Sequence, residues 1–149
     1  MMDIQAALGI HQLARVEENW RARKRIWDRY QVALAPLPVT LPAEPEPMTR
    51  HGYHLYTILV DEAACGVRRD DALRAFTAEK IGVGVHYQSL PEHPYYQESL
   101  GWRPEDTPVA TDIGRRTVSL PLSPGMSDDD VEDVIRAVGR VLSAPNRTP

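Results

Sequence analysis

A histidine and a tyrosine, His86 and Tyr87, end the expected strand 83–87 and could serve chemistry. Side chains at a strand end commonly face a cleft, where an imidazole can hydrogen-bond or transfer a proton. The same aromatic pair could equally serve packing alone. The residues therefore leave two roles open, pocket lining and packing.

Only two lysines could supply a nucleophilic amine. Lys24 lies in the basic run 21–25, where like charges could depress its pKa. Without burial, however, neighbouring charges change a pKa little, and acidic residues flank this run on both sides. An ordinary solvated helix face is therefore favoured over a phosphate or nucleic-acid site. Lys80 ends an expected helix, where a cation complements the helix dipole.

A metal site and a reactive thiol are not expected. His51 and His54 are three residues apart on an extended segment, which points their side chains to opposite faces. Cys65 has no neighbouring base in sequence, and a lone cysteine is usually a small buried hydrophobe. A single cysteine also excludes an internal disulfide and fits a reducing compartment.

The composition is that of one globular domain with its own core. The chain has 149 residues, of which 42% are hydrophobic and 26% charged, and its formal net charge is −4. This charge gives no general attraction to nucleic acid or anionic membranes. We find no apolar run of membrane-spanning length and no signal-peptide pattern, so a cytoplasmic protein is expected.

Residues 3–34 are expected to form one or two long helices, with Asp3 as the cap. Apolar residues recur at mostly three- and four-residue steps and define one face: Ile4, Leu8, Leu13, Val16, Trp20, Trp27, Tyr30 and Leu34. The first turns, which include Ile10, are apolar nearly all round. We therefore expect them to be buried on several sides.

Five prolines within residues 35–50 predict a connector there, with no regular element. Beyond it, strands are expected at 53–60, 83–87 and 117–120. Helices are expected from Asp70 to Lys80 with Gly82 just past the end, from Pro94 to Gly101, after Thr107, and from Ser127 to Leu142. Residues 143–149 are expected to be a flexible tail. The interleaving predicts an α/β domain over 51–142, with a small sheet covered by helices on one face.

Four blocks of sequence resemble, in order, the DegT/DnrJ/EryC/StrS family of sugar aminotransferases. They are Met2–Gly9 with Gln12-Leu13, Tyr53–Tyr56, Gly82–Tyr87 followed by His93–Tyr96, and Leu120–Leu122 with Pro124 and Ser127–Val131. Each block alone is a weak match, but their shared order makes the resemblance specific. It covers the chain up to about Val141.

The resemblance implies the small C-terminal domain of a fold-type-I aminotransferase, with a mostly antiparallel three-stranded sheet. Such enzymes are dimers that use pyridoxal phosphate, held by a lysine as a Schiff base, to aminate keto-sugar nucleotides in amino-sugar biosynthesis. In the family, the residues that hold the cofactor lie in a large domain upstream of the segment matched here. Lys24 and Lys80 do not align with the family lysine, so we expect this chain alone neither to bind the cofactor nor to transaminate.

The resemblance also identifies candidate substrate-pocket residues, and one departure. His86 and Tyr87 belong to a region that borders the substrate pocket in the family. Pro91 stands where the family commonly has a histidine, and proline can neither donate a hydrogen bond nor transfer a proton. His93, two residues further on, is a candidate to compensate. The candidates are therefore His86, Tyr87 and His93.

Three hypotheses follow for the function. In the first, the chain is part of a sugar aminotransferase, and residues 1–34 link it to an absent large domain or partner subunit through Ile4, Leu8 and Ile10. Such a chain would self-associate or form a homo-oligomer, because this apolar face would be exposed. The second is a non-catalytic module that docks on a partner aminotransferase through residues 3–16. The third, an unrelated small enzyme, has no nucleophile, metal cluster or phosphate loop to support it. The particular sugar nucleotide is left open.

Overall fold

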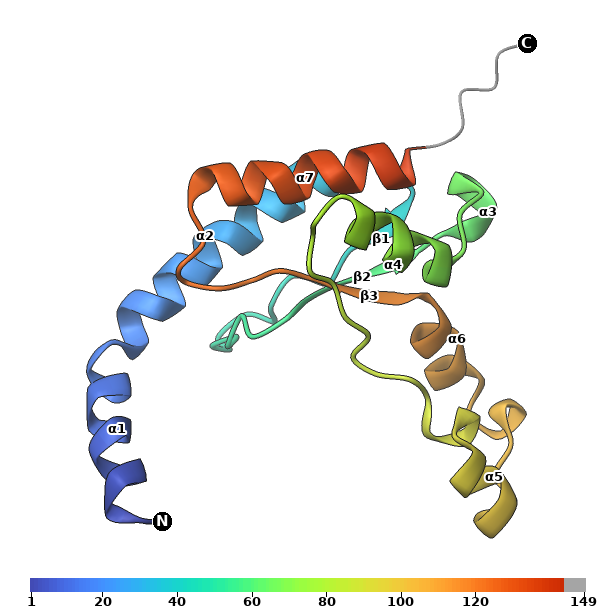
Figure 1. Cartoon of the computed structure of the whole chain (residues 1–149), viewed down its shortest axis with the longest axis horizontal. Coiled ribbons are helices and arrows are strands. Elements are labelled where there is room, and N and C mark those ends of the chain that lie inside the picture. The colour runs from blue at the N-terminus through green and yellow to red at the C-terminus, as the bar shows by residue number, and fades with distance from the viewer. Residues whose placement is uncertain (144–149) are drawn as a thin grey trace.

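Three helices laid over one face of a small sheet form the body of the molecule (Figure 1). The computed structural model describes residues 1–143. The helices of the body are α2 (Val16–Leu34), α4 (Arg69–Ala78) and α7 (Asp128–Leu142), and the strands are β1 (Val39–Thr40), β2 (Tyr56–Val60) and β3 (Thr117–Leu120). The other elements are α1 (Asp3–Ala14), α3 (Glu62–Cys65), η1 (Leu90–Glu92), α5 (Pro94–Leu100), η2 (Pro104–Asp106) and α6 (Pro108–Arg116).

The sheet is antiparallel throughout, in the order β1-β2-β3. Tyr56 pairs with Leu120 and Val39 pairs with Val60. Along β2 every second residue is buried, as expected for a strand with one covered face. The expected α/β fold with a three-stranded antiparallel sheet is therefore confirmed over residues 1–143.

The membership of the sheet differs from the prediction at two places. Residues 83–87 do not form a strand, because only Gly84 pairs with Ser119 before the chain bends at His86. The third strand is instead β1, inside the proline-rich connector. Pro38 and Pro42 flank β1 and lack a backbone N–H group, which keeps this strand short. Prolines are tolerated here because β1 lies at the edge of the sheet.

The expected apolar face of residues 3–34 divides into a buried and an exposed part. Arg15 interrupts the helix with φ −105° and ψ 3°. The second half of α2 buries Ile26, Trp27, Tyr30 and Leu34 in the core. By contrast, α1 buries none of its residues. The prediction is confirmed for the core half. The expected burial of the first turns is not found within residues 1–143, because α1 lies apart from the body (Figure 1).

The last helix, α7, begins as predicted at Ser127. The Asp130 backbone N–H donates to Ser127 Oγ at 3.2 Å, and the Ser127 N–H donates to the Asp130 carboxylate at 2.8 Å. The hydrogen bonds from Ser127 hold the pKa of Asp130 below its usual range. The predicted apolar stripe faces inward, with Val131, Val134, Val138 and Leu142 buried.

Helix boundaries near residues 3 and 70–82 differ from those predicted. Met2, not Asp3, precedes α1, and its backbone N–H donates to Gln5. Arg68, not Asp70, precedes α4. At the other end Lys80 has φ 63°. The backbone N–H groups of Lys80 and Ile81 donate to the carbonyls of Thr77 and Phe76, respectively. This helix cap therefore has lysine at a position where glycine is usual.

Two legs project from the body on the same side (Figure 1). One is α1. The other, which we call the aromatic leg, comprises residues 87–113 and contains η1, α5, η2 and most of α6. The starts of α5 at Pro94 and α6 at Pro108 agree with the prediction. Of the expected tail, only Ser143 is described, and residues 144–149 lie outside the described part.

Two buried tyrosines lead to the first prediction. Tyr30 donates to the Pro121 carbonyl and Tyr56 to the Gln31 side chain, both at 3.0 Å. Burial raises the pKa of both phenols above their ordinary value of about 10. The neutral form is the one that folding favours, so this stability is complete below pH about 10 and is lost as pH rises further. We expect cooperative unfolding in alkaline solution, measured by circular dichroism.

Tyr30→Phe removes one ionisable phenol and should move the alkaline midpoint upward, although it loses a hydrogen bond worth about 1 kcal/mol at neutral pH. Tyr95→Phe is the matched control, because Tyr95 is 66% exposed. Equal alkaline midpoints for the two variants would contradict this account.

Candidate functional site

His86 is anchored to the free edge of the sheet. Gly84 and Ser119 exchange two backbone hydrogen bonds, of 3.2 and 2.8 Å, which place residue 84 beside β3. Two residues later, His86 Nδ1 lies 2.8 Å from the hydroxyl of Ser119, a residue only 4% exposed. Because Nδ1 is engaged, Nε2 is the ring nitrogen left for another group.

The glycine at position 84 makes room for this ring. A Cβ built on Gly84 would lie 3.1 Å from His86 Cε1, closer than most side-chain contacts. The imidazole therefore folds back over the backbone that precedes it. No sequence pattern pointed to Ser119 as the partner, since strand alternation gives a face but not a hydrogen bond.

Tyr87 is exposed, while the backbone around it is held tightly against α6. Its ring contacts that of His86 at a centroid distance of 4.9 Å, and its side chain is 76% exposed. A Cβ on Gly114 would lie 2.8 Å from Ser89 N and 3.2 Å from the Tyr87 carbonyl oxygen. Only glycine allows this approach, so Gly114 positions the segment 87–89.

A salt bridge between Glu92 and Arg115 also holds this segment. Arg115 Nε lies 2.6 Å from the Glu92 carboxylate, whose side chain is 15% exposed. It joins η1 to the last turn of α6. The Ser89 and Thr111 hydroxyls, 3.4 Å apart, add a second contact between the same two parts.

His93 belongs to a different group of side chains. It precedes α5, and the centroid of its ring lies 6.3 Å from that of Tyr96. Tyr96 in turn stacks on Trp102, with ring centroids 5.2 Å apart. The structure thus brings His86 and Tyr87 together and places His93 in an aromatic group on α5. Whether these three residues line a pocket stays a prediction.

The two lysines stand in unsuitable surroundings for a nucleophilic amine. Lys24 Nζ lies 2.6 Å from the Asp28 carboxylate, and this hydrogen bond raises the pKa of Lys24. A Schiff-base amine needs a lowered pKa. Lys80 is exposed at the end of α4. Neither lysine therefore stands in surroundings that favour a Schiff base with pyridoxal phosphate.

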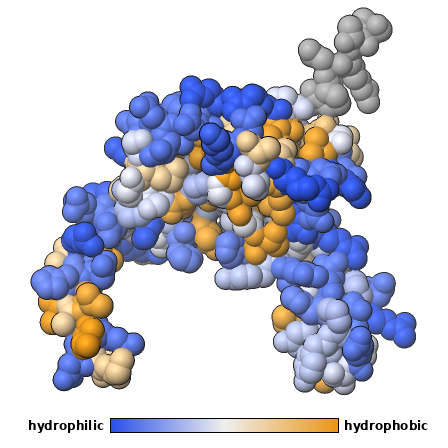
Figure 2. Space-filling model, viewed as in Figure 1, coloured by the Kyte–Doolittle hydropathy of each residue, from blue (hydrophilic) through white to orange (hydrophobic). Residues whose placement is uncertain are grey.

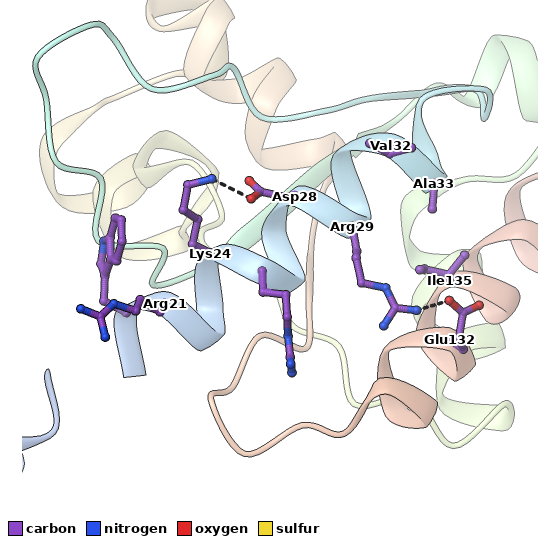
Figure 3. A pocket seen from close by; sticks show the side chains of 10 residues that line it. Arg21, Lys24, Asp28, Arg29, Val32, Ala33, Glu132 and Ile135 are labelled. Atoms are coloured by element: carbon purple, nitrogen blue, oxygen red, sulfur yellow. Dashed lines mark hydrogen bonds and ion pairs between the residues drawn. The ribbon is translucent and has the colours of Figure 1, made fainter. Parts of the chain in front are cut away.

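A hollow of about 660 Å³, which His86 does not line, lies between α2 and α7 (Figure 3). Most of its charged side chains form ion pairs. Lys24 faces Asp28, and Arg29 donates to both Asp128 and Glu132. Exposed pairs of this kind contribute little each, and here the pairs of Arg29 join α2 to α7. We assign this hollow to helix packing.

His51 contacts neighbouring residues of the fold, whereas His54 takes no part in a metal site among the described residues. His51 Nδ1 accepts a hydrogen bond of 3.1 Å from the Tyr53 backbone N–H. The His51 ring packs on Trp27, with ring centroids 4.9 Å apart. His54 is exposed. Within residues 1–143 no three His, Cys, Asp or Glu side chains are grouped to hold a metal.

Cys65 is buried, as expected. Over the same range no helix is long and apolar enough to cross a membrane.

The fold defined above is that of aminotransferases. Spr1654 of Streptococcus pneumoniae, assigned as a sugar aminotransferase, matches 95% of this chain in its apo form with a TM-score of 0.86 and 29% identity. The match covers 35% of Spr1654. DesV of S. venezuelae, solved with a ketimine intermediate, matches 91% of the chain with a TM-score of 0.75 and 28% identity.

The sequence identifies the family. Residues 1–139 match the model of the DegT/DnrJ/EryC1/StrS aminotransferase family, and the chain belongs to this family. The spore coat polysaccharide biosynthesis protein SpsC of Bacillus subtilis is 45% identical over 143 residues. That match covers 95% of this chain but only 37% of SpsC. The chain therefore spans little more than a third of its relatives' length.

The close packing at Gly114 generates the second prediction. Gly114→Ala should lower the free energy of unfolding by about 1–3 kcal/mol, because the new methyl group meets backbone atoms that cannot move aside cheaply. Gly139→Ala is the matched control, since Gly139 lies within α7 with no atom within 4 Å of a built Cβ. The control should be stabilised by roughly 0.5–1 kcal/mol. Chemical denaturation measures both, and equal effects would contradict the packing account.

Proposed function

We propose that this chain is the C-terminal part of a pyridoxal-phosphate-dependent aminotransferase that aminates keto-sugar nucleotides in amino-sugar biosynthesis. The observation that carries this proposal is the agreement of sequence and fold with sugar aminotransferases over 95% of the chain. Spr1654, whose apo form matches so well, has also been solved in PLP and PMP forms. Pyridoxal phosphate is therefore the cofactor proposed for the intact enzyme.

The role that we propose for this chain is on the substrate side. The Ser119 hydroxyl fixes the imidazole of His86, which leaves Nε2 free to hydrogen-bond a substrate or to move a proton. Tyr87 stands exposed beside it, and His93 lies on the aromatic leg. These three side chains would line the substrate pocket once a large domain covers them.

The cofactor would be held outside this chain. Lys24 is paired with Asp28, and Lys80 caps a helix, so neither is proposed as the Schiff-base residue. We infer that residues 1–143 alone neither hold pyridoxal phosphate covalently nor transaminate. A large domain would supply the lysine.

The exposed face of α1 supports a partner for this chain. Ile4, Leu8 and Ile10 are 73%, 61% and 69% exposed, although side chains of this type are normally buried. Figure 2 shows the hydrophobic patch at the end of this leg. We propose that α1 packs on the large domain within a homodimeric enzyme. In the alternative function, a non-catalytic module, the same face would dock on a separate aminotransferase.

The third prediction tests catalysis with a chimera in which this chain replaces the 143 matching residues of SpsC. We expect the chimera to transfer an amino group from an amino acid to a keto-sugar nucleotide, and this chain alone to show no transfer. In the chimera, His86→Ala should lower kcat about tenfold or more, because a positioned proton-transfer group is removed.

His54→Ala is the matched control for the chimera, since His54 is also a histidine and is exposed. Lys24→Ala and Lys80→Ala should leave turnover unchanged. The proposal fails if the chain alone transaminates, or if either lysine variant is inactive while still folded. Equal rates for His86→Ala and His54→Ala would remove His86 from the pocket.

The fourth prediction concerns α1 in the isolated chain. Leu8→Asp should reduce self-association, measured by sedimentation, while the melting temperature stays within about 2 °C, because an exposed position contributes little to stability. Val32→Asp is the control, since Val32 is 79% exposed on α2. If Leu8→Asp instead unfolds a monodisperse protein, α1 serves the chain's own fold, and the proposal of an absent large domain is wrong.

A further inference from the structure

The contact between His86 and Ser119 determines which ring nitrogen of the histidine carries its proton. A neutral imidazole has one N–H donor and one acceptor nitrogen, and the hydrogen bond made by one nitrogen fixes the state of the other. His86 Nδ1 lies 2.8 Å from the Ser119 hydroxyl, so one of these two groups donates to the other. The direction of this hydrogen bond decides what Nε2 offers to a ligand.

The surroundings of Ser119 favour one direction. Its backbone N–H and carbonyl are both bonded to Gly84, and within residues 1–143 the one hydrogen-bond partner of its hydroxyl is His86 Nδ1. If Nδ1 carried the proton, the hydroxyl would accept it, and the hydrogen of the hydroxyl would lack an acceptor. Ser119 is only 4% exposed, so water offers little replacement. A buried donor without a partner is costly, which disfavours this arrangement.

The opposite direction satisfies both groups. The Ser119 O–H donates to Nδ1, which is then the bare nitrogen, and the proton of the neutral ring lies on Nε2. A Cβ built on Gly84 would lie 3.6 Å from Nδ1 and 4.0 Å from Nε2, so Nε2 is the nitrogen farther from this backbone. No side chain or backbone group of residues 1–143 hydrogen-bonds Nε2, and His86 is partly exposed. The ring therefore presents an N–H group that is free for a ligand.

We propose that Ser119 is a positioning residue that fixes His86 as the Nε2–H tautomer. This inference rests on the proposed function, in which His86 lines the substrate pocket. It deepens that function because it names the group that His86 meets, namely an oxygen atom of the keto-sugar nucleotide that accepts a hydrogen bond. Ser119 does not touch the substrate and acts through the imidazole alone.

The first test is the NMR spectrum of the histidine rings in this chain, labelled with ¹⁵N-histidine. Long-range correlations between ring hydrogens and ring nitrogens distinguish a protonated nitrogen from a bare one. The chain has five histidines, and the His86 signals are those that disappear in His86→Ala. In the pH range where these signals no longer change, we expect a single tautomer with Nε2 protonated. Exposed His54 is the internal reference, with signals averaged over both tautomers.

Two variants show whether the hydroxyl of Ser119 fixes the tautomer. Ser119→Ala should move both His86 nitrogen signals toward the averaged values of His54. Thr117→Val is the matched control, because it removes another buried hydroxyl from β3, at a residue that is 1% exposed. This control should leave the His86 signals in place. A proton on Nδ1, averaged signals in the parent chain, or unchanged signals in folded Ser119→Ala would each overturn the proposal.

The second test asks whether Ser119 acts through His86 in catalysis, and it uses the SpsC chimera. Ser119→Ala should lower kcat about fivefold, because the imidazole remains but has lost the hydrogen bond that holds it. In the His86→Ala background the same change should have no further effect, since the group that Ser119 positions is gone. An equal fall in kcat in both backgrounds would indicate a purely structural role for Ser119 and would overturn the proposal.

The two tests separate failure of this inference from failure of the proposed function. Averaged His86 signals together with an active chimera overturn the inference and leave the proposed function standing. A chimera that transfers no amino group contradicts the proposed function, and the spectra of the chain alone then decide whether Ser119 fixes the tautomer.

Discussion

The aromatic contact between α2 and β2 is the interaction on which the rest of the structure depends. Tyr56 meets Trp27 and Tyr30 edge-on, at centroid distances of 4.8 and 5.0 Å, and all three are almost completely buried. Edge-on rings of this kind fix an angle as well as bury area. These contacts fix the orientation of α2 on the sheet, and α7 packs on α2.

The opposite edge of the sheet positions the candidate site. All four residues of β3 are buried, so the strand is rigid, yet one side of its backbone remains available to Gly84. Ser119 uses this edge twice, through its backbone for Gly84 and its hydroxyl for His86. The imidazole is therefore held by the best-packed strand of the protein, although it lies in an irregular segment. Rigid support of this kind is what a positioned catalytic group requires.

Local signals predicted the elements well where one rule dominated. Ser127 predicted the start of α7, and Pro94 and Pro108 predicted the starts of α5 and α6. The prediction was wrong at 83–87, because β-branched residues indicate an extended chain but not the partner strand that a sheet needs. For the site, sequence placed His86 beside Tyr87 but gave no means to find Ser119 or Gly114, since both act through contacts distant in sequence.

The division between body and legs explains how one chain can be both well folded and incomplete in its contacts. Burial is concentrated in α2, the sheet, α4 and α7, whereas α1 and α5 bury no residue. Segments with so few buried contacts open at low free-energy cost, independently of the body. The core of the body therefore does not depend on contacts of α1 or α5.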